Sequence, residues 1–329
     1  MSDSWRGKRV TVTGGVGFIG SNLAIRLVEL GARVQLVDSM LPAYGADLGN
    51  IEPVRERLRV NFSDVRDRHS LGWLVRGEDV IFSLAGQVSH LDSMEDPETD
   101  LEINCRSQLS LLESCRKVNP GVRIVFASTR QLYGRPEYLP VDERHPLRPV
   151  DVNGINKLAA ELYYTLYHRV HGLATVSLRL TNTYGPRMDL ASRRKGFVGV
   201  FLRRALAGET IHVYGTGEQR RDFNYVDDVV DALLLAGESD RLLGETFNLG
   251  HPRPYSLIEF LETLRRFVPF DWEPVPFPTD LAAIDIGDYY GDYAAFARAT
   301  GWSPRIDLPE GLERTVRWFQ GEPARFAGG

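Results

Sequence analysis

The sequence predicts an α/β protein built on a doubly wound parallel sheet, with a smaller C-terminal α/β domain. Two observations lead to this prediction. In the first half of the chain, short apolar runs of strand length alternate with longer segments whose apolar residues have helical spacing. After about residue 180 the segments become shorter and are separated by glycine and proline turns, so we expect a second domain there.

The pattern of the first half predicts alternating strands and helices. Strands are expected at Val10–Thr13, Val34–Val37, Leu58–Phe62, Val80–Leu84, Ile124–Ala127 and Thr175–Leu180. Helices are expected at Phe18–Leu30, Asp100–Lys117 and Asn153–Val170. Right-handed crossovers between such strands give one parallel sheet with helices on both faces. We expect residues 1–180, with contributions from about 220–250, to form this first domain.

Residues 181–329 are expected to form the second domain. Turn clusters occur at Gly185–Pro186, Gly215–Gly217 and Gly250–Pro252. Pro269–Pro278 is rich in proline and predicts an irregular connection, whereas Leu308–Phe319 has the spacing of a closing amphipathic helix.

Composition and charge are typical of a globular protein and not of a binder of nucleic acid or membranes. The chain is 43% hydrophobic and 25% charged, and its net charge of -5 gives no basic stripe. Its longest basic run, Arg193–Lys195, predicts a solvated loop. The polar start, Met1–Lys8, is not typical of a signal peptide, and no apolar run approaches the roughly 20 residues of a membrane span. We therefore expect a cytoplasmic protein.

The two cysteines indicate neither a disulfide nor a metal. Cys105 and Cys115 lie in one predicted helix, about 15 Å apart along its axis, and cannot pair with each other. No spacing of cysteine and histidine is typical of a zinc site, so no metal is expected.

A glycine-rich turn follows the first predicted strand. Gly14, Gly17 and Gly20 are spaced three residues apart, and the helix begins with Phe18 and Ile19. Glycines in this place permit a tight turn, a close approach to a pyrophosphate and close packing of helix on strand. The start of the helix offers unpaired N–H groups to the phosphates. Because the motif joins a strand to a helix, it predicts a dinucleotide site on a Rossmann sheet.

The second predicted strand ends at Asp38, eighteen residues after Gly20. A carboxylate there accepts hydrogen bonds from both ribose hydroxyls and repels a 2′-phosphate. The sequence therefore predicts NAD rather than NADP.

Further motifs, in the same order along nearly the whole chain, resemble those of the extended short-chain dehydrogenase/reductases that act on sugar nucleotides. They are Asp64–Val65, Leu84–Gln87, Asn104, Ser128–Thr129, Tyr133–Gly134, Leu178–Arg179, Asn182, Tyr184–Arg187, Arg221–Phe223, Tyr225–Asp228 and Gly301–Trp302. The resemblance implies an NAD-dependent epimerase or dehydratase of a nucleotide-linked sugar.

The resemblance also implies binding roles. Asp64 and Val65 would hold the adenine, and Leu84, Ala85 and Gly86 would line the cofactor. Gln87, Arg130, Tyr133, Asn182 and Arg221 are the candidates for substrate binding. A guanidinium suits a diphosphate because it is planar and permanently charged; the alternative for Arg221 is a surface ion pair with Asp222. For Tyr133, the sequence favours a packing role over contact with the sugar.

In the family, a Ser/Thr, a Tyr and a Lys four residues after the Tyr move the proton of the sugar hydroxyl. Thr129 and Lys157 match two of these residues, but Asn153 stands four residues before Lys157. An amide can orient a hydroxyl, although it has no usable pKa and cannot act as the base. We therefore predict an atypical catalytic centre made of Thr129, Asn153 and Lys157.

Several groups could replace the missing tyrosine. Tyr164 shares a helix face with Lys157 but lies about 10 Å along the axis, and Tyr163 points elsewhere. Tyr133 could reach the sugar. His90 follows the Leu84–Gln87 loop and titrates near neutrality, although a lone histidine in a loop is commonly only a polar loop residue. A water relayed by Thr129 and Lys157 is a further alternative.

Two other departures from the family bear on the reaction. Arg130 and Gln131 occupy the places of the Asp-Glu pair of the 4,6-dehydratases. Neither residue can donate or abstract a proton as that carboxyl pair does, so the sequence argues against a 4,6-dehydratase. Asp285 stands where the family often has an arginine for the diphosphate, two residues before Gly287–Asp288.

Three functions therefore remain open. The first is a nucleotide-sugar epimerase with regenerated NAD. The second is a decarboxylase or another elimination enzyme, in which Arg130 holds a uronate carboxylate. The third is a catalytically silent NAD-binding scaffold or sensor. The resemblance also implies a homodimer formed through two helices per subunit, Asp100–Lys117 and Asn153–Val170.

Overall fold

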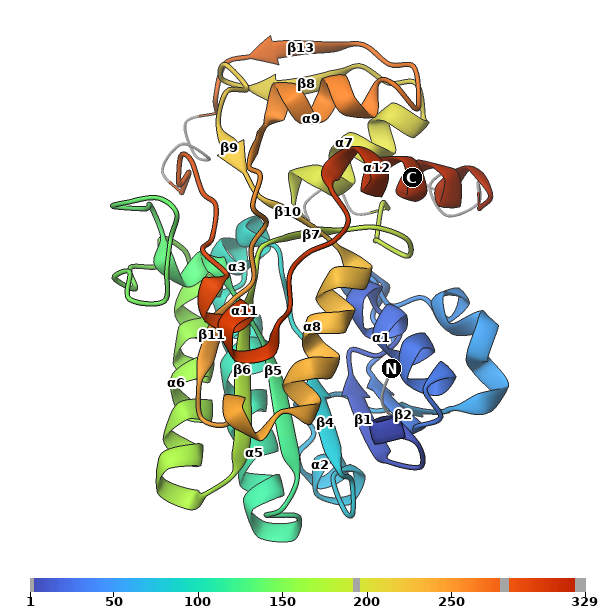
Figure 1. The fold of residues 1–329 in the computed structure, drawn as a ribbon, viewed down its shortest axis with the longest axis vertical. Helices are drawn as coiled ribbons and strands as arrows, with labels where there is room; N and C mark the ends of the chain where they lie inside the picture. Colours follow the sequence, from blue (N-terminus) through green and yellow to red (C-terminus); the bar gives the residue numbers. More distant parts are fainter. Residues whose placement is uncertain (1–2, 192–195, 279–283, 323–329) are drawn as a thin grey trace.

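The computed structural model describes residues 3–191, 196–278 and 284–322. Its centre is a seven-stranded sheet in which all neighbouring strands are parallel, with helices on both faces (Figure 1). The strands are, in spatial order, β11 (Thr246–Asn248), β6 (Ala174–Leu180), β5 (Arg123–Thr129), β4 (Val80–Ser83), β1 (Arg9–Thr13), β2 (Arg33–Asp38) and β3 (Arg59–Phe62). The predicted doubly wound α/β sheet is confirmed.

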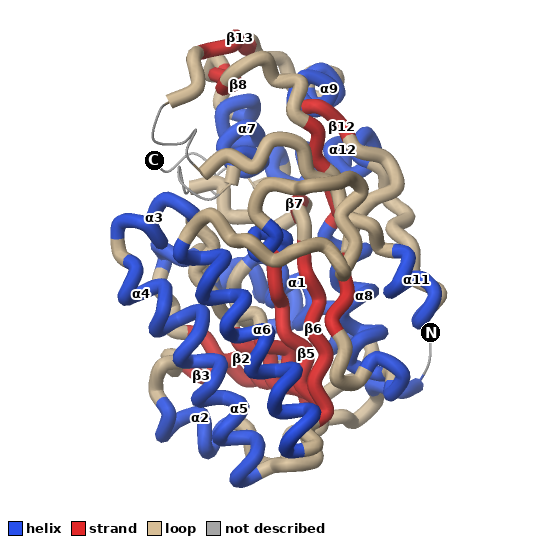
Figure 2. The backbone as a smooth tube through the Cα atoms, turned by 90° about the vertical axis from the view of Figure 1, so that its left-hand side faces the viewer, coloured by secondary structure: helices blue, strands red, loops and turns tan. Residues whose placement is uncertain are grey.

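Successive side chains along each strand point to opposite faces of this sheet, so each face has its own hydrophobic core. Val80 and Phe82 of β4 pack in the cluster that includes α1 (Phe18–Glu29) and α8 (Val226–Glu238), whereas Ile81 packs in the cluster of the opposite face. That opposite face carries α2 (Arg68–Leu74), α5 (Ser107–Val118) and α6 (Val152–His171), which lie in front of the sheet in Figure 2.

The helix predicted at Asp100–Lys117 is divided in the structure. It begins as α4 (Pro97–Leu101), widens into one π-helical segment, η4 (Glu102–Arg106), and continues as α5. Single π-type turns inside helices are frequent at functional sites. Asn104 lies in this wide turn and is completely buried, and α3 (His90–Glu95) precedes it in the chain.

The remaining elements gather at the carboxyl end of the sheet, in the upper part of Figure 1. Small sheets pair β7 (Asn182–Tyr184) with β10 (Phe223–Tyr225), β8 (Ile211–Tyr214) with β13 (Trp272–Val275), and β9 (Arg220–Arg221) with β12 (Tyr255–Ser256). The helices here are α7 (Phe197–Leu206), α9 (Leu257–Leu264) and α12 (Leu308–Gln320); α11 (Ala294–Thr300) packs beside β11. The division of the chain into domains at residue 180 stays a prediction.

One expected irregular segment is wrong. Within Pro269–Pro278, the residues Trp272–Val275 form β13, which pairs with β8 in parallel register. Pro274 lies inside this strand, and a proline is tolerated there because β13 has a neighbour on one side only.

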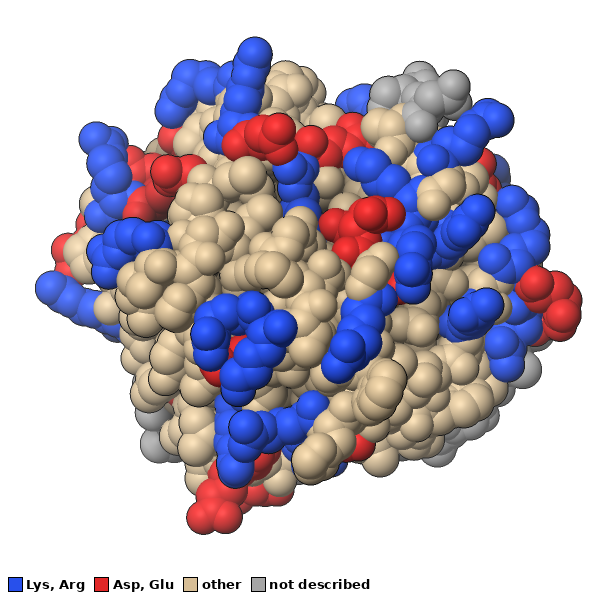
Figure 3. Space-filling view, turned by 90° about the horizontal axis from the view of Figure 1, so that it is seen from below, with Lys and Arg blue, Asp and Glu red and all other residues tan. Residues whose placement is uncertain are grey.

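Short helical turns complete the described chain. They are η1 (Asp3–Trp5), η2 (Pro42–Tyr44), η3 (Leu48–Arg57), η5 (Arg130–Tyr133) and η6 (Asp240–Leu242). Among the described residues no helix is long and apolar enough to cross a membrane. In Figure 3 the lysines and arginines of one face are interspersed with acidic and uncharged side chains. The basic run Arg193–Lys195 lies outside the described residues.

Candidate active site

The glycine turn between β1 and α1 is held by close backbone contacts. Gly14 has a φ of 67°, and a Cβ atom there would lie 2.9 Å from the backbone of Ala85. A Cβ at Gly20 would lie 2.2 Å from the carbonyl oxygen of Gly14. The cap of α1 is Gly17, which has no side chain to bind the first N–H groups, and the first turn contains no acidic residue. These N–H groups are therefore available to an anionic ligand.

Asp38 lies next to this turn, at the end of β2. Its Oδ2 accepts a hydrogen bond from the backbone of Val16 at 3.2 Å, and its Oδ1 accepts one from Met40 at 3.0 Å. Burial raises the pKa of Asp38, while these two backbone donors act in the opposite direction. The carboxylate is thus fixed at the carboxyl edge of the sheet, where each oxygen keeps further acceptor capacity.

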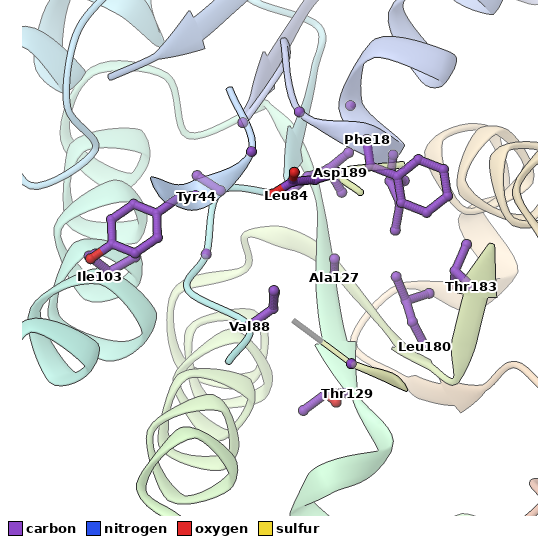
Figure 4. A pocket seen from close by; sticks show the side chains of 18 of the residues that line it. Phe18, Tyr44, Leu84, Val88, Ile103, Ala127, Thr129, Leu180, Thr183 and Asp189 are labelled. Carbon is purple, nitrogen blue, oxygen red and sulfur yellow. The ribbon is translucent and has the colours of Figure 1, made fainter. Parts of the chain in front are cut away.

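A cavity of about 370 Å³ lies along this edge. It opens where the strand order reverses between β1 and β4, the usual place for a ligand in a doubly wound sheet. In Figure 4, Phe18, Leu84 and Thr129 border the space from three segments of the chain. The predicted cofactor residues all line it: Gly14, Gly17, Phe18, Ile19, Gly20, Asp38, Asp64, Val65, Leu84, Ala85, Gly86 and Lys157. Thr129, Asn153, Asn182 and Gln131 line it as well.

Lys157 is a buried cation in the wall of this cavity. Its Nζ donates to the carbonyl oxygen of Ala127 at 3.2 Å and lies 5.0 Å from the centre of the Phe126 ring. Burial lowers the pKa of Lys157 to about 8, although the charge of Asp100 acts in the opposite direction. Thr129 lies at the end of β5, where its Oγ1 accepts a hydrogen bond from the backbone of Gln131 at 3.2 Å.

Asn153 is held by a network of buried amides around Asp100. Its Nδ2 donates to the carbonyl oxygen of Gln87 at 2.8 Å and to Oδ2 of Asp100 at 3.0 Å. Asn104 and Asn156 donate to the same carboxylate at 3.0 and 2.8 Å. The amide nitrogen of Asn153 is therefore engaged, and Oδ1 is the atom that it can offer to a ligand.

A second polar group lies beside Asn153, and the sequence did not identify it as a unit. Nδ1 of His90 contacts Oδ2 of Asp151, the residue that caps α6. Nε2 of the same ring lies 2.6 Å from Nε2 of Gln131. His90 is thus not an isolated loop residue but the first residue of α3, joined to both neighbouring segments. Because Asp151 and Gln131 lie 61 and 41 positions from His90 in the sequence, no local pattern indicates these contacts.

Two predicted substrate residues lie behind the wall of the cavity. Tyr133 is completely buried, and its hydroxyl donates to Oδ1 of Asn248 at 2.7 Å and accepts from Arg179 at 2.5 Å. Both hydrogen-bond partners of the Tyr133 hydroxyl are thus protein groups, and Tyr133 is not one of the residues that line the cavity. Gln87 is also buried, and its Nε2 donates to the carbonyl oxygen of Ser89 at 2.9 Å.

The two predicted arginines gather near Asn182 in a buried cluster. Nη2 of Arg130 lies 3.4 Å from Oδ1 of Asn182, and the guanidinium lies 5.1 Å from the centre of the Tyr289 ring. Nη1 of Arg130 is buried without a hydrogen-bond partner among the described residues. Burial lowers the pKa of Arg221 to about 10, and the charge of Arg130 acts in the same direction.

Arg221 does not form the surface ion pair that was the alternative. It is 6% exposed, and its Nη1 donates to the carbonyl oxygens of Arg220 and Gly287. Asp222 turns away, so that its Oδ2 accepts from the backbone of Gly291 at 2.9 Å, and burial raises its pKa to about 7. Asp285 lies with Arg220 and Asp288 in the lining of a separate depression.

The chain is similar to known proteins over most of its length. The model of the NAD dependent epimerase/dehydratase family matches residues 10–250. A UDP-glucose 4-epimerase of Mycolicibacterium smegmatis is 32% identical, over 95% of this chain and 98% of its own. A UDP-glucuronic acid decarboxylase 1 of Xenopus tropicalis is 31% identical, over 96% of this chain and 73% of its own. The structure of a Thermotoga maritima UDP-glucose 4-epimerase with UDP-glucose superposes with a TM-score of 0.87, at 33% identity, over 96% of this chain and 99% of its own.

Proposed function

The chain belongs to the NAD dependent epimerase/dehydratase family, and from that premise we propose that it is a nucleotide-sugar epimerase. It would oxidise one sugar hydroxyl transiently and allow the resulting ketone to be reduced from its other face. The observation that carries the proposal is one cavity bordered by the glycine turn, Thr129 and Lys157 together. NAD, held by the residues described below, would supply the hydride acceptor that this chemistry needs.

The residues around the cavity fit this dinucleotide. The uncapped N–H groups at the start of α1 would bind the pyrophosphate, and Asp38 would accept from the hydroxyls of one ribose. Asp64 and Val65 would contact the adenine. Lys157, whose buried ammonium lies beside Gly86, would donate to the other ribose.

The substrate would extend from Thr129 toward the cluster of Asn182 and Arg130. Thr129 would bind the reacting hydroxyl, and Asn153 would orient the sugar through its Oδ1. Asn182 and Arg221 are proposed to hold the diphosphate, with Arg130 between them and the sugar. A permanently charged guanidinium in a buried site gives strong charge-assisted hydrogen bonds to phosphate.

The proposal is tested with purified protein, NAD and a panel of UDP-, GDP-, CDP- and dTDP-sugars. We expect one nucleotide sugar to reach an equilibrium with its epimer, measured by chromatography and NMR of the sugar. Binding of NAD without conversion of any sugar would instead indicate a silent scaffold or sensor.

Arg130 favours a decarboxylase as the second candidate. Its buried Nη1 lacks a partner among the described residues and could bind the carboxylate of a uronate. The same panel therefore includes UDP-glucuronate, and release of carbon dioxide would favour this candidate over an epimerase.

We also propose that the protein forms a homodimer through α6 and the neighbouring α4–α5 segment. One side of α6 exposes a row of large apolar side chains at helical spacing. They are Ile155, Leu162, Leu166 and Val170, exposed by 54, 56, 39 and 59%. These helices lie together on the face turned to the viewer in Figure 2. In a symmetric dimer, this row would pack against the same row of the second subunit.

Replacing Leu162 and Leu166 together by glutamate is expected to produce a monomer. Each leucine buried at a dimer interface contributes about 1.5–3 kcal/mol, and two-fold symmetry counts each substitution twice. The dissociation constant should therefore rise by at least about 10⁴-fold. Light scattering after gel filtration measures the change. The control is Phe62→Glu, on the edge strand β3, which removes an apolar side chain exposed by 61% elsewhere and should leave the dimer intact.

A further inference from the structure

A row of three buried polar side chains crosses the carboxyl edge of the sheet, on the face that α6 covers. In the pairing of β5, β6 and β11, Ser128 lies opposite Arg179, and Arg179 lies opposite Asn248. Glu161 of α6 accepts a hydrogen bond from Oγ of Ser128 at 2.5 Å. It also accepts from Nε and Nη2 of Arg179 at 3.0 and 2.5 Å. The row is therefore fixed to the helix that carries Lys157.

Tyr133, the last residue of η5, is joined to this row by its hydroxyl. Nη1 of Arg179 donates to the hydroxyl at 2.5 Å, and the hydroxyl donates to Oδ1 of Asn248 at 2.7 Å. The direction of both bonds follows from the chemistry, because a guanidinium can only donate. Nδ2 of Asn248 donates to the carbonyl oxygen of Val141 at 2.9 Å, so that its Oδ1 faces Tyr133. The end of η5 is thus bound to two neighbouring strands of the sheet.

The phenol of Tyr133 cannot itself take part in proton transfer near neutral pH. Burial raises its pKa to about 12, although the charge and the hydrogen bond of Arg179 act in the opposite direction. The phenol therefore keeps its proton, which it donates to Asn248. Tyr133 is also not among the residues that line the cavity. Any contribution of Tyr133 to the reaction therefore passes through another residue.

The short turn η5 connects Tyr133 with Thr129. At the start of η5, Oγ1 of Thr129 accepts a hydrogen bond from the backbone N–H of Gln131 at 3.2 Å. At its end, Gly134 has a φ of 66°, and a Cβ atom there would lie 2.0 Å from the carbonyl oxygen of Arg148. Because η5 has only four residues and is held at both ends, a shift of Tyr133 moves the N–H group that holds Thr129.

We propose that Tyr133 is a positioning residue, which fixes the direction of the Thr129 hydroxyl through η5. The inference rests on the proposed function, in which Thr129 binds the reacting hydroxyl of the sugar. The N–H of Gln131 occupies one lone pair of Oγ1, so the O–H group and the other lone pair remain for the sugar. Fixing this hydroxyl matters because a misplacement of about 1 Å in a reacting centre can lower the rate by about 10²-fold.

The first test is Tyr133→Phe, which removes the hydroxyl and keeps the ring beside Arg179. We expect kcat for the converted nucleotide sugar to fall by about 10- to 10²-fold. KM and NAD affinity should not change, because neither ligand contacts Tyr133. The matched control is Tyr167→Phe, a buried tyrosine at the far end of α6 whose hydroxyl donates to Glu113 at 2.8 Å. It should keep the kcat of the original protein. Thermal unfolding shows that both variants fold.

A double-mutant cycle tests whether Tyr133 acts through Thr129. Residues that act as a unit have non-additive effects on the rate. In a Thr129→Ala background, Tyr133→Phe should therefore cause little further loss of kcat, because the hydroxyl that it positions is gone. Single-turnover assays at high protein concentration measure these slow variants. An equal fold-loss in both backgrounds would show that Tyr133 acts independently of Thr129 and would contradict the proposal.

Crystal structures of the two variants test the same geometry without turnover. In Tyr133→Phe, η5 should shift and Oγ1 of Thr129 should lose its bond from Gln131, whereas Tyr167→Phe should leave both in place. An unmoved Thr129, an unchanged kcat, or a loss that appears in KM and NAD affinity would each overturn the positioning role, while the proposed function stands. If the original protein converts no nucleotide sugar, the proposed function is wrong, and the crystal structures alone decide whether Tyr133 holds Thr129.

Discussion

Replacing Lys157 by methionine is expected to lower kcat by roughly 10²- to 10³-fold, the range found when one preorganised hydrogen-bond donor is removed from a reacting centre. NAD should also bind less tightly, because a hydrogen bond from a charged donor contributes about 1.5–3 kcal/mol. The side chains have nearly equal length, so the volume of the cavity wall changes little. Steady-state kinetics and NAD titration near neutral pH measure both effects.

The same variant should not be less stable than the original protein. Its methionine removes a cation whose burial is unfavourable, and replacing a buried charge by an apolar side chain of similar volume is commonly neutral or stabilising. Loss of activity with an unchanged unfolding temperature would therefore come from the chemistry. Lys117→Met, on the exposed surface of α5, is the control and should keep full activity.

The pH dependence follows from the lowered pKa of Lys157. Its ammonium is present below about pH 8 and is lost above it, so kcat should decline as the pH rises through that value. The effect on stability has the opposite sign. Between about pH 8 and 10.5, the ordinary pKa of a lysine, the unfolded chain binds more protons than the folded one, so the stability contributed by this group rises with pH. The methionine variant should lack both dependences.

The sheet could be predicted because each central strand is buried on both faces. Continuous apolar runs such as Val80–Ser83 result, and they alternate with helices that cover one face only. The seventh strand, β11, has only three residues and is defined by pairing with β6, so no run of its own indicated it. Helix α8 was not predicted as an element, although its valines and leucines are buried. Its start coincides with the Tyr225–Asp228 motif, which was interpreted only as part of the family resemblance.

The cofactor side of the site was more predictable than the substrate side. Glycines and acidic residues at strand ends are local in sequence, and the predicted set lines one cavity. Partners on the substrate side come from distant segments. The burial of Tyr133 depends on Asn248 and Arg179, and the partners of His90 come from η5 and the cap of α6. Such contacts are determined by the packing of helices on the sheet, which no single segment encodes.

Glu161→Ala is expected to cause the largest loss of stability of any single substitution considered for this protein. Glu161 lies on α6 and is 3% exposed, and its two oxygens bind Nη2 and Nε of Arg179 at 2.5 and 3.0 Å. Removing it leaves the guanidinium of Arg179 buried without its counterion, which costs about 3–5 kcal/mol. Denaturation by urea should show a lower midpoint at an unchanged slope.

An exposed ion pair of the same residue types serves as the control. It shows whether the loss of stability in Glu161→Ala comes from burial of the remaining charge or from loss of the ion pair alone. Glu313 and Arg317 on α12 are 2.6 Å apart, with side chains exposed by 48 and 76%. Glu313→Ala should therefore cost only about 0–1 kcal/mol. The double variant Glu161→Leu, Arg179→Met should be more stable than Glu161→Ala, because it leaves no unpaired charge. If Glu161→Ala were no more destabilising than Glu313→Ala, this ion pair would not be what joins α6 to β6 behind Thr129.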